Sequence, residues 1–183
     1  MHPAPWRSQR GSLPFFSDLL MAGAGGDRPV PRMEGTSVAI IVSDFHADIT
    51  EGLLSGAREA ATQAGLRDDA VAVYRVPGAW ELPLAADAAA SSGRFGAVVA
   101  LGCVVRGETP HFDYVAGEAS RGLARVALRA RVPVGFGLLT TDDDDQARRR
   151  AAPGVANKGR EAMLAALETL RTLSAIHDGA PRS

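Results

Sequence analysis

The segment RGETPHFDYV, residues 106–115, combines residue types that can hold an anion and move a proton. Gly107 allows a ligand to approach the backbone closely, Thr109 offers a hydroxyl and an amide, and Pro110 followed by His111 is typical of a helix start. The free N–H groups of a helix start favour an anion such as phosphate. They also favour the neutral imidazole of His111, which can accept a proton near pH 7. On spacing alone, a capping role for His111 is the alternative.

Three aromatic side chains, Phe45, Trp80 and Phe136, are expected near strand ends, in or beside loops. Flat rings at such places suit stacking against a planar heterocycle, with core packing as the alternative for each. Neither GxGxxG nor GxxxxGK[ST] follows any predicted strand. A dinucleotide or nucleoside-triphosphate site therefore has no support.

The segment TTDDDDQARRR, residues 140–150, reads as a helix with an acidic first turn and a basic end, preceded by Thr140 or Thr141 as the cap. This charge order is the one that the helix macrodipole prefers, so most of it is expected to be a solvated surface. Arg150 at the end of this helix can still clamp a phosphate, with charge-assisted hydrogen bonds of roughly 1.5 to 3 kcal/mol each.

Positioning these segments together requires a scaffold, and the sequence predicts one. Nearly continuous apolar runs, typical of strands buried on both faces, alternate with longer helical patterns. The predicted strands are 38–43, 70–76, 97–105 and 132–139, and the predicted helices are 48–65, 80–92, 112–131, 143–151 and 155–175. Such alternation favours a three-layer α/β/α sandwich with a central four-stranded parallel sheet. Ligands of such sheets bind beyond the carboxyl ends of the strands, where the segments 44–46, 77–81, 106–111 and 140–142 follow.

Composition excludes several other classes of protein. The 183 residues are 46% hydrophobic and 22% charged with a formal net charge of -1, as in one soluble globular domain. No apolar run approaches the roughly 18 to 20 residues that cross a bilayer, and the dispersed arginines leave no basic patch for nucleic acid. The single cysteine, Cys103, can form neither an internal disulfide nor a thiolate metal site alone, which favours a reducing cytoplasm. Arginine supplies every basic residue except Lys158.

The ends of the chain differ in character from the middle. Residues 1–33 are rich in proline and glycine without apolar periodicity, and the domain is expected at 36–175, between a disordered leader at 1–35 and a frayed tail at 176–183. A start at Met21 or Met33, or an organellar signal, is the alternative for the leader.

Five segments resemble one known family. In chain order they are SDFH (43–46), RVPGAWELPLA (75–85), ALGCVVRGETPHFDYV (100–115), FGLLTTDDDDQARRRA (136–151) and NKGREA (157–162). Together they look like the 6,7-dimethyl-8-ribityllumazine synthases of riboflavin biosynthesis, over about residues 38–170. The resemblance implies a flavodoxin-like fold and the penultimate step of that pathway. In it, 5-amino-6-(D-ribitylamino)uracil condenses with 3,4-dihydroxy-2-butanone 4-phosphate, releasing phosphate and two waters without a metal or organic cofactor.

The resemblance also implies roles for single residues. His111 would carry protons, Arg150 would clamp the phosphate, and Phe45 would stack on the pyrimidine. Residues of the phosphate loop would be Glu108 and Thr109. Further contacts to the pyrimidine and the ribityl chain would come from Ala79, Trp80, Glu81, Cys103, Val104, Val105, Phe136 and Lys158.

The same resemblance implies that the chain forms a homo-oligomer. Family members are pentamers, decamers or hollow shells of twelve pentamers, and riboflavin synthase is a possible partner. Their sites lie between neighbouring subunits, so Phe136, Arg150 and Lys158 would come from the adjacent chain. The sequence departs from the family at His46, where asparagine is commoner, and at Trp80, where phenylalanine is commoner. It departs again at Gly154, where many members carry lysine.

Two other readings stay open at this point. One is a catalytically weak homologue that binds lumazine or flavin, or that mainly builds a shell. The other is a flavodoxin-like or response-regulator domain, which fits the strand pattern but leaves residues 106–115 and 157–159 unexplained. That reading would need a phosphoacceptor at a strand end, for which Asp44 is a weak candidate.

Overall fold

The computed structural model describes residues 30–179. In chain order the elements are β1 (Val38–Ser43), α2 (Ala47–Gln63), η1 (Asp68–Ala70), β2 (Val71–Val76), η2 (Ala79–Glu81), α3 (Leu82–Ser91), β3 (Ala97–Val105), α4 (His111–Ala130), β4 (Val134–Thr141), α5 (Asp144–Ala151) and α6 (Lys158–His177). Most of the predicted leader, including Met21, lies outside the described residues, as does the end of the predicted tail.

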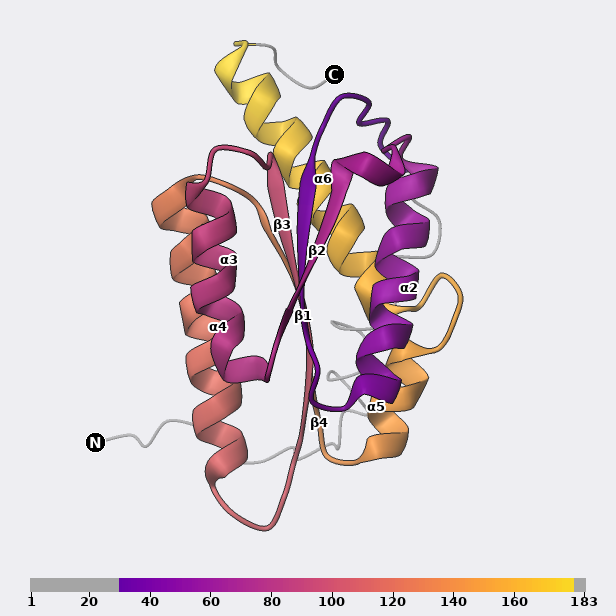
Figure 1. Ribbon diagram of the computed structural model, residues 1–183, viewed down its shortest axis with the longest axis vertical. Coiled ribbons are helices and arrows are strands. Elements are labelled where there is room, and N and C mark those ends of the chain that lie inside the picture. The colour runs from indigo at the N-terminus through magenta and orange to yellow at the C-terminus, as the bar shows by residue number, and fades with distance from the viewer. Residues whose placement is uncertain (1–29, 180–183) are drawn as a thin grey trace, which may run out of the picture.

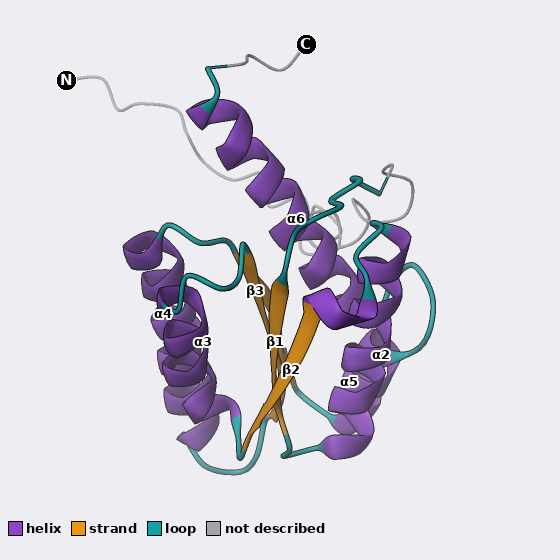
Figure 2. Cartoon of the chain, turned by 45° about the horizontal axis from the view of Figure 1, so that its top comes forward, coloured by secondary structure: helices purple, strands orange, loops and turns teal. Residues whose placement is uncertain are grey.

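The four strands form one parallel sheet in the order β2-β1-β3-β4. Helices α3 and α4 cover one face, and α2, α5 and α6 cover the other (Figures 1 and 2). The predicted three-layer α/β/α sandwich with a four-stranded parallel sheet is therefore confirmed. Among the described helices, none is both long and apolar enough to cross a membrane.

Burial separates the inner strands from the outer ones. All of β1 is buried, and so are the first seven residues of β3, because each has a strand on both sides and helices on both faces. The outer strands are only partly covered: Tyr74 and Arg75 on β2 are exposed, as are Phe136 and Thr140 on β4. The expectation that all four strands are buried on both faces was wrong for β2 and β4, which lie at the edges of the sheet.

The fourth strand and the helix after it also differ from the prediction. Strand β4 begins and ends two residues later than expected, so Thr140 and Thr141 belong to the strand and do not cap α5. The cap is Asp143, whose side chain accepts a hydrogen bond of 2.6 Å from the backbone N–H of Gln146. Threonine fits a strand as well as a cap, and here the pairing of Thr140 and Thr141 with β3 decides between them.

Helices α2 and α6 cross at unusually close range. A methyl group on Gly159 of α6 would lie 1.9 Å from the backbone oxygen of Leu53 in α2. Nearby on α2, a methyl group on Gly52 would lie 2.6 Å from the backbone oxygen of Ala151, the last residue of α5. The two glycines therefore let α2 touch the backbones of α6 and α5 where any side chain would separate them.

Asn157 fixes the start of α6 at this crossing and is almost fully buried. Its Oδ1 accepts hydrogen bonds from the N–H groups of Gly159 (2.9 Å) and Arg160 (3.0 Å). Its Nδ2 donates to the carbonyls of Gly52 (3.0 Å) and Ala151 (2.7 Å), and to that of Ala152 (3.1 Å). One side chain thus joins α2, the end of α5 and the start of α6.

The last residues of the predicted leader pack against the domain. Val30 and Met33 contact the core cluster on the α2 side of the sheet, and the N–H of Met33 donates to the carbonyl of Ala64 (2.9 Å). At the other end α6 continues to His177, past the predicted boundary at residue 175.

Candidate functional site

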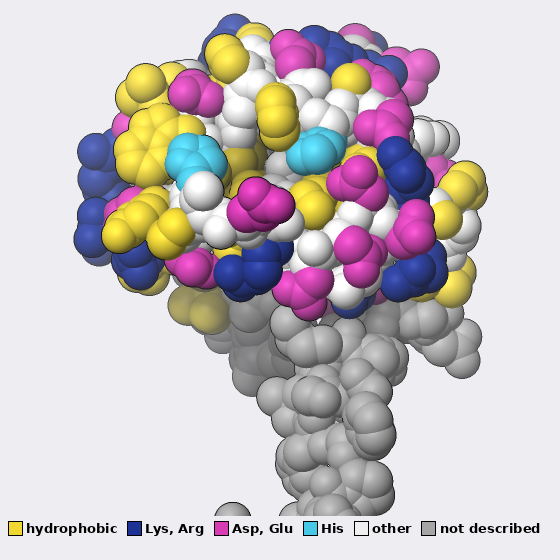
Figure 3. All heavy atoms as spheres, turned by 90° about the horizontal axis from the view of Figure 1, so that it is seen from below, with side chains coloured by type: hydrophobic (Ala, Val, Ile, Leu, Met, Phe, Trp, Pro, Cys, Tyr) yellow, Lys and Arg dark blue, Asp and Glu magenta, His cyan; other side chains and the backbone are white. Residues whose placement is uncertain are grey.

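The four loops that follow the strands lie at one edge of the sheet, the lower end of the molecule in Figure 1. Figure 3 views the molecule from this end and shows hydrophobic, histidine, acidic and basic side chains gathered on one face. The chain leaves β1 toward α2 on one face and leaves β3 toward α4 on the other. This topological switch point, between residues 44–46 and 106–110, is where open parallel sheets hold their ligands.

The loop after β1 presents Phe45, whose side chain is 66% exposed. The N–H groups of Asp44 and Phe45 donate to the carbonyls of Val76 (2.8 Å) and Pro77 (3.1 Å), which ties this loop to the loop after β2. His46 adopts a left-handed conformation with φ 59° and packs edge-on against the Phe45 ring at 4.7 Å between centroids. Asparagine, aspartate and histidine are the non-glycine residues enriched in this conformation. The local backbone therefore explains why asparagine and histidine can both occupy this position.

The loop after β2 continues into the short helix η2 and so into α3. Within η2, Ala79 is buried, Glu81 is half-buried and Trp80 is 58% exposed. The predicted helix 80–92 therefore begins as a 3-10 turn, with the α-helix starting at Leu82. Phe45 and Trp80 share the carboxyl edge of β1 and β2, as the sequence predicted.

The loop after β3 exposes Glu108, Thr109 and His111. Pro110 is the N-cap residue and His111 is the first residue of α4. Its imidazole has no hydrogen-bond partner within residues 30–179, so the capping alternative finds no support there. The loop itself is held by Arg106, its first residue.

Arg106 links this loop to the loop after β4. Its N–H donates to the carbonyl of Thr141 (2.9 Å), and its guanidinium lies 3.3 Å from Asp113 and 3.4 Å from Asp142. The same guanidinium stands 4.1 Å from the centre of the Phe112 ring, within cation–π range. The predicted phosphate loop is thus anchored at one end by a backbone bond, two ion pairs and a ring contact.

Strand β3 reaches this edge with Cys103, Val104 and Val105. The side chain of Cys103 is buried in the core on the α2 side, whereas Val104 and Val105 are half-buried. Burial, together with the nearby carboxylates of Asp144 and Asp48, raises the pKa of the Cys103 thiol to about 11. This thiol is therefore neutral near pH 7 and is not activated as a nucleophile.

Three of the predicted residues belong to strands or helices and not to the four loops. Phe136 is the third residue of β4, pairs with Ala100 in mid-sheet and is half-exposed. It was expected near the end of the strand, which was wrong because β4 runs on to Thr141. Arg150 is on the last turn of α5, where it donates to the carbonyl of Gln146 (3.1 Å). Lys158 opens α6 and pairs with Glu161 at 2.7 Å.

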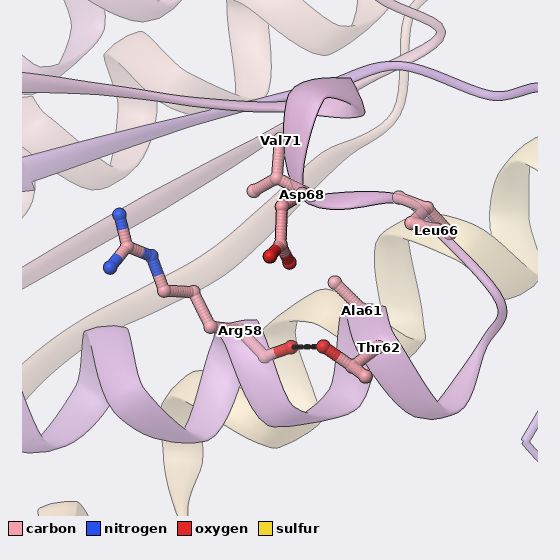
Figure 4. A pocket seen from close by; sticks show the side chains of 6 residues that line it. All are labelled: Arg58, Ala61, Thr62, Leu66, Asp68 and Val71. Carbon is pink, nitrogen blue, oxygen red and sulfur yellow. Dashed lines mark hydrogen bonds between the residues drawn. The ribbon is translucent and has the colours of Figure 1, made fainter.

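Two hollows lie outside the four loops. One, of about 380 Å³, lies between α2 and α5, where Arg148 and Asp48 form an ion pair at 3.0 Å that lowers the pKa of Asp48. The other, of about 270 Å³, lies at the amino end of β2, away from the loops (Figure 4). Arg58 and Asp68 line it, but the Thr62 hydroxyl donates to the backbone carbonyl of Arg58 and not into the space. We therefore place the candidate site at the loops.

One family model matches most of the described chain. The model of the 6,7-dimethyl-8-ribityllumazine synthase family matches residues 35–174, from the turn before β1 to near the end of α6. The chain belongs to this family. Lumazine synthases are enzymes of riboflavin biosynthesis, and the match includes all four strands and the loops that follow them. No cluster of histidine, cysteine, aspartate and glutamate side chains suited to a metal ion occurs within the described residues.

The residues that hold these loops are not the ones that the sequence singled out. Arg75 pairs with Asp44 in the loop after β1, and Arg106 pairs with Asp142 in the loop after β4. Asn157 holds α2, α5 and α6 together instead. All three residues have partners that are distant in the chain, and no local spacing reveals such partners. Asn157 did carry a signal, because asparagine directly before a helical pattern is typical of an N-cap. In the segment NKG the structure therefore gives Asn157 and Gly159 structural roles, and the ammonium group of Lys158 pairs with Glu161.

Proposed function

We propose that this lumazine synthase family member condenses 5-amino-6-(D-ribitylamino)uracil with 3,4-dihydroxy-2-butanone 4-phosphate. The products are 6,7-dimethyl-8-ribityllumazine, inorganic phosphate and two waters, and the reaction is the penultimate step of riboflavin biosynthesis. The observation that carries the proposal is the meeting of the exposed Phe45 and the exposed loop 106–110 at the switch point of the sheet.

The two sides of the switch point suit the two substrates. On the β1 and β2 side, the rings of Phe45 and Trp80 offer stacking surface for a pyrimidine, and Glu81, which follows Trp80 in η2, is proposed to hold the ribityl chain. On the β3 side, the backbone N–H groups of Glu108 and Thr109, the Thr109 hydroxyl and the N-terminus of α4 suit a phosphate group. Holding both substrates together replaces much of the entropy cost of a bimolecular reaction.

The chemistry itself consists of proton transfers. The arylamine attacks the ketone, water leaves to form the imine, phosphate is eliminated, and ring closure expels the second water. Each step needs a base or an acid, and a well-placed one contributes about 10²- to 10⁴-fold in rate. His111 is the proposed carrier, since its imidazole is exposed at the start of α4, beside the loop proposed to hold the phosphate.

The proposal extends to the assembly and its surroundings. Arg150, Lys158 and Phe136, which belong to α5, α6 and β4 and not to the four loops, are proposed to complete the site of a neighbouring copy. Pentamers, decamers or shells of twelve pentamers would all provide such junctions, and a cytoplasmic location fits the single buried thiol. Riboflavin synthase, which would consume the product, is the proposed partner.

Incubation of the full chain with the two substrates, followed by the fluorescence of the lumazine product, tests the function. We expect turnover well above the uncatalysed condensation, with one phosphate released per lumazine. Product binding without turnover would instead indicate the alternative, a weak homologue that binds lumazine or flavin.

A further inference from the structure

Arg75 is the last residue but one of β2, and its guanidinium bridges two carboxylates on other elements. Its Nη1 donates to Oδ1 of Asp44 at 2.9 Å, and its Nη2 donates to Oε1 of Glu51. Asp44 belongs to the loop after β1, and Glu51 lies on the second turn of α2. One side chain from the edge strand therefore bonds both to the loop that carries Phe45 and His46 and to the helix that follows it.

We propose that Arg75 is a positioning residue that sets the loop of residues 44–46 for binding of the pyrimidine substrate. This inference rests on the proposed function, because it takes Phe45 as the ring on which the pyrimidine stacks. Arg75 does not itself need to touch the substrate. It acts through Asp44, the residue directly before Phe45.

The side from which Arg75 acts follows from the register of the sheet. Arg75 pairs with Val42 in the parallel ladder, and Val71 and Val73, which have the same alternation along β2, pack against the core on the α2 side. Arg75 thus leaves the sheet toward α2, under the turn where residues 44–46 cross from β1 into the helix. Its side chain is 46% exposed there.

The loop needs such a support because its backbone is strained. His46 has φ 59° and ψ 49°, a left-handed conformation that is unfavourable for a residue with a side chain. Strain of this kind persists only where the surroundings hold it. Two backbone bonds, from the N–H groups of Asp44 and Phe45, hold one side of the loop. The ion pair with Arg75 is the one side-chain hydrogen bond that the structure, over residues 30–179, gives to residues 44–46.

The charges of Asp44 and Glu51 also require a cation such as Arg75 between them. Without Arg75, the carboxylates of Asp44 and Glu51 would face the space of its guanidinium with no cation between them. Their mutual repulsion would favour an opened loop and a displaced Phe45 ring. With Arg75 present, its guanidinium attracts both carboxylates and so attaches the loop and the helix to β2.

The test is the kinetic effect of Arg75→Met, which keeps the apolar stem and removes the charge. We expect KM for the pyrimidine to rise by about three- to tenfold, the size expected when one or two half-exposed ion pairs are lost. KM for the butanone phosphate should stay within about twofold, because that substrate is proposed to bind across the switch point. Arg75→Lys should recover part of the effect, since lysine can still pair with one carboxylate.

A double-mutant cycle identifies the route of action. Asp44→Asn should raise the same KM, and combining it with Arg75→Met should add little, since either change breaks the same bond. Glu51→Gln should have the smaller effect, because Glu51 lies on the helix and not in the loop. Arg67→Met is the matched control. It removes another exposed ion pair, between Arg67 and Asp69, which lies just before β2 at the opposite end of the strand.

Each outcome decides something. An unchanged pyrimidine KM in Arg75→Met, in a protein that makes lumazine, would overturn the positioning role, and so would full additivity with Asp44→Asn. If Arg75→Met folds poorly, Asp44→Asn carries the test alone, because it retains the arginine. Failure of the unmodified protein to make lumazine would reject the proposed function instead, and tryptophan-quenching titration with the pyrimidine would still measure the role of Arg75 in binding.

Discussion

At the scale of single residues, the imidazole of His111 has no hydrogen-bond partner in the described part of the chain. It is exposed at the first position of α4. His111→Ala should therefore lower turnover about tenfold or more while leaving the free energy of unfolding within roughly 0.5 kcal/mol. Steady-state lumazine formation and urea unfolding measure the two. An unchanged rate would return His111 to a local role at the helix start.

His46 allows a prediction that concerns backbone conformation alone. Because its φ is 59°, we expect His46→Asn to keep the free energy of unfolding and His46→Val to lose about 1 to 2 kcal/mol. The control is His177→Val, the same exchange in the last turn of α6, where the backbone is helical. Urea unfolding of the three variants gives the comparison. Equal losses at both positions would show that the left-handed turn is not the cause.

Sequence alone could place His111, Phe45 and Trp80 at the carboxyl edge of the sheet, because each lies in the segment that follows an apolar run. It could not find Arg75. The partners of Arg75 are 31 and 24 residues away along the chain, and only the pairing of β2 with β1 brings them together. Sequence alone also could not identify Thr140 and Thr141 as strand residues, since their pairing with β3 decides this.

At the scale of elements, the crossing of α2 and α6 sets how deep α6 can pack. A methyl group on Gly159 would meet a backbone oxygen 1.9 Å away, which cannot move without moving α2. Gly159→Ala should therefore reduce the free energy of unfolding by about 1 to 3 kcal/mol, as overpacking does. Thermal and urea unfolding measure the loss.

Gly117 provides the matched control for that variant, since it is also a helical glycine. A methyl group there would meet only the flexible tip of Arg121, at 3.1 Å. Gly117→Ala should therefore gain about 0.5 to 1 kcal/mol through helix propensity. A loss of similar size at both positions would mean that the close crossing is not what limits residue 159.

The elements were largely predictable because the hydrophobic pattern was strong where burial was complete. Strands β1 and β3 were predicted to the residue, since both are buried runs between helices. Strand β4 begins and ends two residues later than predicted. Helix α6 begins three residues later than predicted, because the tight turn at 152–157 has no apolar pattern. The glycines of β4, Gly135 and Gly137, weaken the pattern further, yet they are what lets α6 and β3 approach that strand.

At the scale of the whole molecule, the distribution of the proposed site residues has a direct consequence. If Arg150 serves the site of a neighbouring copy, chains carrying His111→Ala and chains carrying Arg150→Ala should each be impaired alone. Co-assembly of the two should restore activity at junctions where an intact His111 meets an intact Arg150. Lumazine formation by co-expressed, differently tagged chains measures this. Activity no higher than the mean of the two separate variants would place both residues in one chain's site.

The buried Asn157 links positions that are about a hundred residues apart in the chain. A methyl group on Gly56 would lie 2.1 Å from Oδ1 of Asn157, so α2 can carry a side chain at position 56 only if residue 157 changes as well. The two positions are therefore expected to vary together among descendants of this sequence. Because Lys158 directly follows Asn157, the contact between residues 56 and 157 helps to set the orientation of its backbone. A substitution at position 56 of α2 would thus displace Lys158 from its proposed ligand contact without altering Lys158 itself.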